Sequence, residues 1–210
     1  MDQFVSLFGR KDHLIRLDCR SLGYDYYHFE PIGYKLVLIN SKVKHELKDS
    51  PYNRRRRSCE RVAAMLGASL LRDATIEMLD EIRSELPPED YFRAKYVIEE
   101  RDRVLAVCAA LNRQDYETVG RKMYETHRGL SQDFDVSCEE LDFLVAIARK
   151  NGVTGSRMMG GGFGGCTINL IREELYEPFV NSVRNEFNQK YGHMPEIYDV
   201  VISDGARRLV

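Results

Sequence analysis

The stretch Met158-Met159-Gly160-Gly161-Gly162-Phe163-Gly164-Gly165-Cys166-Thr167 is the most informative part of the chain. It contains five glycines within six consecutive positions, Gly160, Gly161, Gly162, Gly164 and Gly165. Glycine loses more backbone entropy on folding than any other residue, so such a cluster indicates backbone with positive φ or a close approach by another group. A turn that cradles an anion or a substrate meets both conditions. The sequence therefore predicts a binding loop at these glycines.

Three of the glycines, Gly160, Gly162 and Gly165, also match the G-x-G-x-x-G spacing of dinucleotide-binding loops. That motif requires a helix directly after its last glycine. Residues 166–171 instead alternate and are rich in β-branched side chains, which predicts a strand. The run also lacks the Gly-Lys-Ser/Thr ending of a Walker-type phosphate loop. A hairpin or bulge without a ligand stays open as an alternative, although a hairpin needs only about two glycines.

The composition is that of an ordinary globular protein, with 210 residues, 43% hydrophobic and 30% charged. A net charge of -2 gives no reason to expect nucleic acid or a membrane as a partner. The N-terminus lacks the layout of a signal peptide, so we expect a cytoplasmic protein. The five cysteines are widely spaced and show no metal-ligand pattern. We therefore expect buried free thiols and assign no metal site.

The first forty residues predict strands, and the following hundred predict helices. Strands are expected over residues 14–19, 24–29 and 35–40, joined by tight turns into an antiparallel meander. Apolar residues at three- and four-residue spacing predict helices over residues 60–66, 76–86, 91–112, 116–130 and 138–150. A strand, a helix and a final strand are expected over residues 166–171, 175–191 and 196–202. The predicted class is α+β, with a largely antiparallel sheet packed against several helices.

The run Arg54-Arg55-Arg56-Arg57 follows a turn-and-cap sequence and is predicted to lie on the first turns of a helix. Successive helical residues point about a quarter-turn apart, so four arginines cannot all face one ligand. We expect one or two of them to pair with carboxylates and the others to be solvated. Tyr52, at the start of this helix, and Asp2, near the N-terminus, indicate no function on their own.

Several motifs, in a fixed order along the chain, resemble those of galactokinases, a family of the GHMP small-molecule kinase superfamily. They stand at residues 1–4 (Met-Asp-Gln-Phe), 17–21, 40–45, 52–56, 126–130, 136–142, 156–165 and 204–206. Each motif is modest alone, but the ordered series covers nearly the whole chain. The resemblance implies that residues 1–210 are the C-terminal domain of such a kinase, with a ferredoxin-like core.

The resemblance also implies site residues. Asp2 matches the family's active-site aspartate, which is commonly assigned as general base toward the anomeric hydroxyl of the sugar. Tyr52 matches a tyrosine that contacts the sugar. The glycines from Gly160 to Gly165 match the third GHMP motif, whose loop lies against the active centre, with Gly161 and Gly162 as substrate contacts. The implied substrates are galactose and ATP with Mg²⁺, and no residue here is assigned as a metal ligand.

Two motifs of the family do not occur in these 210 residues: a Gly-Glu-His-Thr-Asp-Tyr sugar segment and a Gly-Leu-Ser-Ser-Ser-Ala phosphate loop. Both precede Met-Asp-Gln-Phe in the family. We therefore expect a C-terminal fragment that cannot phosphorylate galactose alone, since ATP and Mg²⁺ would bind mainly to the missing domain. Its exposed domain interface is expected to favour self-association. A non-catalytic sugar sensor or regulator, or a related N-acetylgalactosamine or arabinose kinase, stays open as an alternative.

Overall fold

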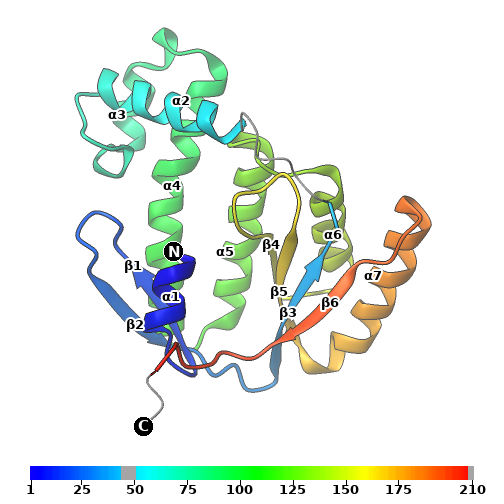
Figure 1. Cartoon of the computed structure of the whole chain (residues 1–210). Coiled ribbons are helices and arrows are strands. Elements are labelled where there is room, and N and C mark those ends of the chain that lie inside the picture. Colours follow the sequence, from blue (N-terminus) through cyan, green and yellow to red (C-terminus); the bar gives the residue numbers. More distant parts are fainter. Residues whose placement is uncertain (44–50, 208–210) are drawn as a thin grey trace.

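A four-stranded antiparallel sheet with the order β4-β5-β3-β6 lies at the centre of the computed structural model, which describes residues 1–43 and 51–207 (Figure 1). Its strands are β3 (Tyr34–Asn40), β4 (Gly155–Met158), β5 (Cys166–Arg172) and β6 (Glu196–Val200). Helices connect β3 to β4, a hairpin joins β4 to β5, and one helix connects β5 to β6. This is the β-α-β-β-α-β arrangement of ferredoxin-like folds. The predicted α+β class is confirmed.

Six helices follow the apolar periodicity of the sequence. They are α2 (Pro51–Met65), α3 (Ile76–Glu81), α4 (Pro88–Leu111), α5 (Tyr116–Arg128), α6 (Glu139–Lys150) and α7 (Tyr176–Tyr191). Short turns of other helical types lie at Leu71–Asp73, Arg83–Glu85, Gly129–Asp133 and Glu173–Leu175. The predicted helices are confirmed, and α2 carries the arginine run on its first turns, as expected.

The main core lies between the sheet and helices α6 and α7. Val37 and Ile39 of β3 are fully buried against these helices, as the two-residue period of a strand requires. Phe179, Val183 and Phe187 stand four residues apart on α7 and are also fully buried. This stripe fixes α7 on one face of the sheet. On the other side, α5 packs against β4.

A separate helical cluster stands at one end of the molecule. Figure 1 shows α2 and α3 beside the end of α4 that projects beyond the sheet. Val62 of α2, Leu79 of α3 and Ile98 of α4 are fully buried in the same apolar cluster. This packing holds α2 in place, and with it the first turns that contain Tyr52 and the arginine run.

The first two strands form a hairpin of their own, and the predicted three-stranded meander is wrong. β1 (His13–Leu17) pairs only with β2 (Tyr24–His28), whereas β3 pairs with β5 and β6. The reason is burial: β3 carries fully buried apolar side chains and takes a central place in the main sheet, while β1 and β2 are half-buried or exposed throughout. Sequence proximity alone gave the wrong partner.

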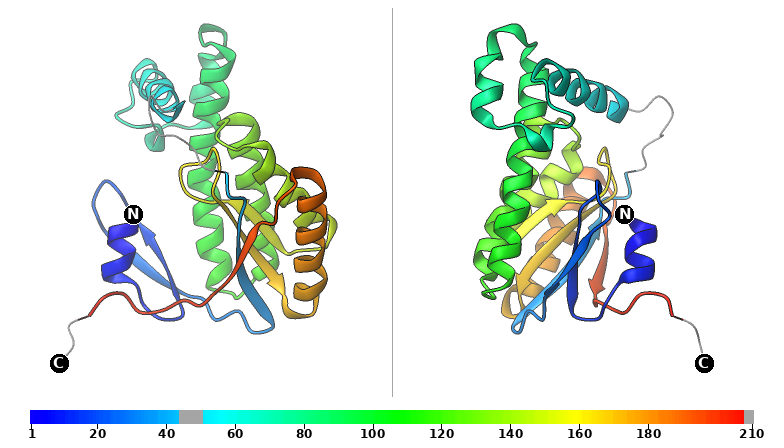
Figure 2. Two further views of the ribbon diagram at one scale, coloured as in Figure 1. Left: turned by 45° about the vertical axis from the view of Figure 1, so that its right-hand side comes forward. Right: turned by 90° about the vertical axis from the view of Figure 1, so that its left-hand side faces the viewer.

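The two ends of the described chain lie together beside this hairpin, as Figure 2 shows. Helix α1 (Asp2–Phe8), which the apolar pattern did not predict, packs Phe4 and Phe8 against Tyr24 with ring centroids 5.2 and 5.5 Å apart. The C-terminal segment returns to α1, since the backbone N–H of Gly205 donates to the carbonyl oxygen of Gly9 over 2.8 Å.

No helix within residues 1–43 and 51–207 has the length and apolar character needed to cross a membrane. All five cysteines are free thiols. Cys108 is buried, as expected, and burial raises the pKa of the Cys59 and Cys138 thiols to about 11. The expectation of burial is wrong for Cys19, which is exposed.

Candidate functional site

The glycine run forms the loop of the β4–β5 hairpin. The strands pair up to Met158 and Thr167, and the N–H of Met159 donates to the carbonyl oxygen of Cys166 over 3.0 Å. The hairpin alternative is therefore correct for the connection. Positive φ occurs at Gly160, Gly162, Gly164 and Gly165, and also at Phe163. The loop is much longer than the two residues that a hairpin needs, so reversing the chain direction does not by itself explain its length.

Two of the glycines are required by close packing. A Cβ atom on Gly162 would lie 2.0 Å from the carbonyl oxygen of Val136, and one on Gly164 would lie 2.6 Å from that of Val43. Hydrogen bonds fix the same contacts, since the N–H of Phe163 donates to Val136 over 2.7 Å and that of Gly165 to Val43 over 3.3 Å. This side of the loop is anchored to the neighbouring backbone.

The other side of the loop is open. A Cβ atom on Gly160, Gly161 or Gly165 would meet no other atom within 4 Å. Within the described part of the chain, the N–H groups of Gly160, Gly161 and Gly164 donate no hydrogen bond. Successive unpaired backbone N–H groups beside glycines with positive φ form a concave site suited to an oxyanion. The loop is thus rigidly held on one side and available for a ligand on the other.

Arg55 connects this loop to helix α2. Its side chain is buried, pairs with Asp135, and donates from Nε to the carbonyl oxygen of Phe134 over 3.2 Å. The guanidinium carbon also lies 5.5 Å from the ring centroid of Phe163 in the glycine loop. Burial lowers the pKa of Arg55, and the charge of Asp135 opposes this effect. Arg55 therefore places the first turns of α2 beside the glycine loop.

Tyr52 stands on the same first turns of α2. Its side chain is 49% exposed and makes no hydrogen bond within the described residues. An amphipathic phenol held at a helix start, with its hydroxyl free, is available to contact a polar ligand. The structure thus brings the helix of Tyr52 and the glycine loop together through Arg55.

Asp2 is not part of this group of contacts. It is exposed in the first turn of α1. Among the described residues its side chain makes no hydrogen bond or ion pair, so no such bond joins it to Tyr52 or to the glycine loop. Within residues 1–43 and 51–207 no group of three His, Cys, Asp or Glu side chains could hold a metal ion.

His127 supports the glycine loop from behind, a function that sequence analysis missed. Its Nδ1 accepts a hydrogen bond of 3.2 Å from the N–H of Met158 at the end of β4, so the ring proton is on Nε2, which lies 3.2 Å from Oδ1 of Asp142. Ser131 and Ser137 also donate to Asp142, over 2.8 and 2.5 Å. Burial raises the pKa of Asp142, but these hydrogen bonds outweigh it and lower the pKa. The available signal was that His127 and Asp142 lie in the motifs at residues 126–130 and 136–142.

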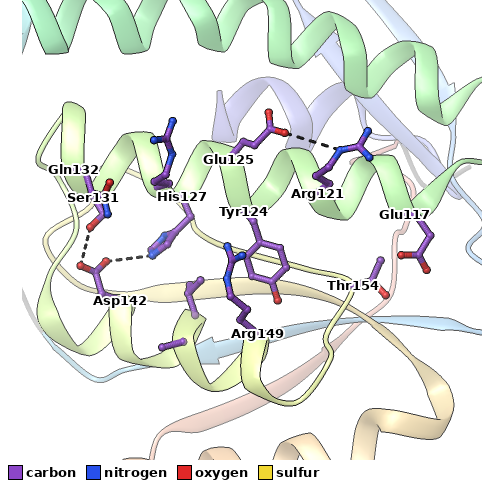
Figure 3. Close-up of a pocket in the computed structure, with 13 residues that line it drawn as sticks. Glu117, Arg121, Tyr124, Glu125, His127, Ser131, Gln132, Asp142, Arg149 and Thr154 are labelled. Atoms are coloured by element: carbon purple, nitrogen blue, oxygen red, sulfur yellow. Dashed lines mark hydrogen bonds and ion pairs between the residues drawn. The ribbon is translucent and has the colours of Figure 1, made fainter.

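This network borders a groove of about 870 Å³ between α5 and α6, shown in Figure 3. Its lining includes three arginines and three carboxylates: Arg121, Arg128, Arg149, Glu117, Glu125 and Asp142. The guanidinium carbon of Arg149 lies 4.3 Å from the ring centroid of Tyr124. These charged residues balance one another in number, and Arg121 lies 4.0 Å from Glu125.

Similarity to known proteins first indicates the class of protein. Residues 108–189 match the family described as GHMP kinases C terminal. A homoserine kinase of Cytophaga hutchinsonii (TM-score 0.57, 15% identity) and a mevalonate kinase of L. major (TM-score 0.56, 17% identity) share the fold. The chain contains a GHMP kinase C-terminal domain.

Relatives that match the whole chain are galactokinases. The chain is 39% identical to the galactokinase of Thermotoga neapolitana and 41% identical to that of Homo sapiens, over its full length in both cases. The structure of Lactococcus lactis galactokinase complexed with galactose matches 99% of the chain with a TM-score of 0.90 and 28% identity. The chain spans 59%, 53% and 55% of these three proteins, respectively.

Proposed function

We propose that residues 1–210 form the C-terminal domain of a galactokinase-type enzyme that transfers the γ-phosphoryl group of MgATP to the C1 hydroxyl of galactose. The observation that carries this proposal is the glycine loop, which is anchored on one side and offers unpaired N–H groups on the other. The similarity to galactokinases over the whole chain supports the same substrate class. Phosphoryl transfer needs an oriented nucleophile and neutralised phosphate charge more than covalent help from the protein.

The residue roles follow from this proposal. Asp2 would accept the proton of the attacking hydroxyl or orient it, as a carboxylate within hydrogen-bond reach can do. Tyr52 would contact the sugar, and the backbone at Gly161 and Gly162 would lie against the substrate. The described residues hold no cluster of metal ligands, so we assign no Mg²⁺ ligand to them and derive no step through the metal.

The first prediction is that this 210-residue chain alone does not phosphorylate galactose. The sugar and phosphate motifs expected from the family do not occur in it. A complemented enzyme, made by joining the chain to the part of the Thermotoga neapolitana galactokinase that it does not match, should be active. Formation of ADP and sugar 1-phosphate by both proteins is the measurement. Stoichiometric sugar 1-phosphate from the isolated chain would contradict this prediction.

The second prediction concerns self-association. Val5 and Leu7 of α1 are 53% and 62% exposed, and Phe8 beside them is 42% exposed. Apolar side chains grouped in this way favour association. The isolated chain should sediment with a mass that rises with concentration, and Leu7→Lys should reduce the rise. Ile32→Lys, at a residue 86% exposed and outside α1, is the matched control. A mass that is constant with concentration contradicts the expectation.

A non-catalytic sugar sensor and a related N-acetylgalactosamine or arabinose kinase are the alternatives. A sensor would bind sugar and nucleotide without forming ADP, whereas the related kinases would turn over a different sugar. An assay of the full-length protein on these three sugars therefore separates the alternatives from the proposed galactokinase activity.

A further inference from the structure

A second cluster of charged side chains, mostly arginines, lies on helices α2 and α4. A pocket of about 420 Å³ opens between α2 and the start of α4, next to Asp135. Its lining residues are Arg54, Arg55, Arg57, Ser58, Arg61, Glu89, Arg93 and Asp135. As expected, two arginines of the run pair with carboxylates, Arg55 with Asp135 and Arg56 with Glu60, and three of the four line this pocket. Only Arg56 of the run is outside it, paired with Glu60 on the exposed face of α2.

The helical period explains this grouping. Arg54, Arg57, Ser58 and Arg61 are spaced i, i+3, i+4 and i+7, which places them on one stripe of α2. Like charges three and four residues apart on a helix repel one another and destabilise it. A stripe of three arginines is therefore costly unless negative charge faces it.

The protein neutralises only part of this charge. Arg55 pairs with Asp135, Arg61 donates from Nε to the buried Asp90 over 2.8 Å, and Arg93 donates to Glu89 over 3.3 Å. Five guanidinium groups against these three carboxylates leave two positive charges. They belong to Arg54 and Arg57, which are exposed and make no ion pair with any described residue.

The deeper wall of the pocket is preorganised. Arg93 is 8% exposed, and its Nη1 donates to Oγ of Ser58 over 2.9 Å. Arg55 is 4% exposed and is held by Asp135 and the carbonyl oxygen of Phe134. Buried guanidinium groups with fixed orientation bind oxyanions well, because their planar N–H groups match two oxygens at once. The volume lies in the range of small-molecule sites.

We propose that this pocket binds an oxyanion of the phosphate class, through Arg54 and Arg57 at its mouth and Arg93 in its wall. Inorganic phosphate and the phosphate group of a small ester share this chemistry. Arg55 links the pocket to the glycine loop. It lines the pocket, and its guanidinium carbon lies 5.5 Å from the ring centroid of Phe163. A bound anion would thus face the same side chain that holds α2 beside that loop.

The experiment is calorimetric titration of the 210-residue chain with inorganic phosphate at about 50 mM salt, where screening is modest. We expect saturable binding of one phosphate per chain. Arg54→Gln with Arg57→Gln should weaken it roughly tenfold or more, because two charge-assisted contacts are lost. The matched control is Arg56→Gln with Arg113→Gln, which removes equal charge from exposed positions outside the pocket. It should change the affinity less than about twofold.

The thermal unfolding temperature gives a second readout. Phosphate should raise it in the unchanged chain and in the control, but not in the Arg54/Arg57 double variant. Titration with galactose 1-phosphate separates the two sources of the phosphate group. If galactose 1-phosphate binds more tightly than inorganic phosphate and the double variant abolishes this binding, the site is assigned to a phosphate ester. If it binds equally or more weakly, the site is assigned to inorganic phosphate. The proposal is overturned if no saturable binding occurs, or if both double variants lose affinity equally.

Discussion

Asp2→Asn in the complemented enzyme should lower kcat for galactose phosphorylation by roughly 10²- to 10⁴-fold, the usual range for loss of a general base. Asparagine keeps the shape of the side chain and its capacity to accept a hydrogen bond, but it cannot take a proton. KM for galactose should change little, because the proposed role of Asp2 lies in the reaction rather than in binding. Steady-state kinetics with a coupled ADP assay measures both constants.

The fold gives no reason for an indirect effect of this substitution. Asp2 is exposed, and its side chain has no partner among the described residues. Asp12→Asn is the control: the side chain of Asp12 is half-buried and makes only a 4.0 Å ion pair with Lys11, and its φ of 56° is one that asparagine tolerates. Full activity of the Asp2→Asn enzyme would remove Asp2 from the proposed mechanism.

Gly162→Ala should destabilise the chain and inactivate the complemented enzyme. The new Cβ would lie 2.0 Å from the carbonyl oxygen of Val136, at a φ of 88°. Positive φ alone costs about 1–3 kcal/mol in a residue with a side chain, and the overlap with backbone forces the loop to move. A displacement of about 1 Å in a substrate-positioning loop can lower kcat/KM by about 10²-fold. Urea unfolding and steady-state kinetics measure the two effects.

Gly161→Ala is the matched control for stability. No atom lies within 4 Å of its added Cβ, and its φ is not in the left-handed region. Alanine there should leave the free energy of unfolding unchanged or raise it by up to about 1 kcal/mol, by restricting the unfolded chain. If both substitutions had the same effect on stability, the anchoring of Gly162 against Val136 would be wrong.

The sequence predicted the helices well because their cores follow a regular period. Phe179, Val183 and Phe187 of α7 are an example, since each turn of the helix repeats the same signal. Strand pairing was not predicted correctly, because the partner of a strand depends on which strands can be buried in the sheet. β3 lay next to β2 in the sequence, yet its fully buried Val37 and Ile39 place it beside β5.

The short strand β4 was missed for another reason. Gly155 and Ser156 have no strand preference, and the strand forms by pairing with β5, where its backbone also approaches α5 closely. A Cβ on Gly155 would lie 2.4 Å from the Cα of Gly120. Such a contact between distant residues leaves no local pattern in the sequence.

The candidate site was predicted only in part. Glycine clustering correctly indicated a loop with positive φ and close backbone contacts. The roles of Arg55 and His127 depend on partners far away in the sequence, Asp135 and Asp142, so no local spacing could reveal them. The helical period does predict that Arg54, Arg57 and Arg61 share one face of α2. The stripe is hard to recognise in the sequence because Arg56, on another face, belongs to the same run of arginines.

The central claim is that this chain supplies one part of a galactose-phosphorylating site. ³¹P NMR of the full-length protein with MgATP and galactose tests it directly. We expect ADP and galactose 1-phosphate in equal amounts, with N-acetylgalactosamine and arabinose turned over about 10²-fold less efficiently. Sugar binding without any ADP or sugar phosphate, or faster turnover of another sugar, would contradict the claim.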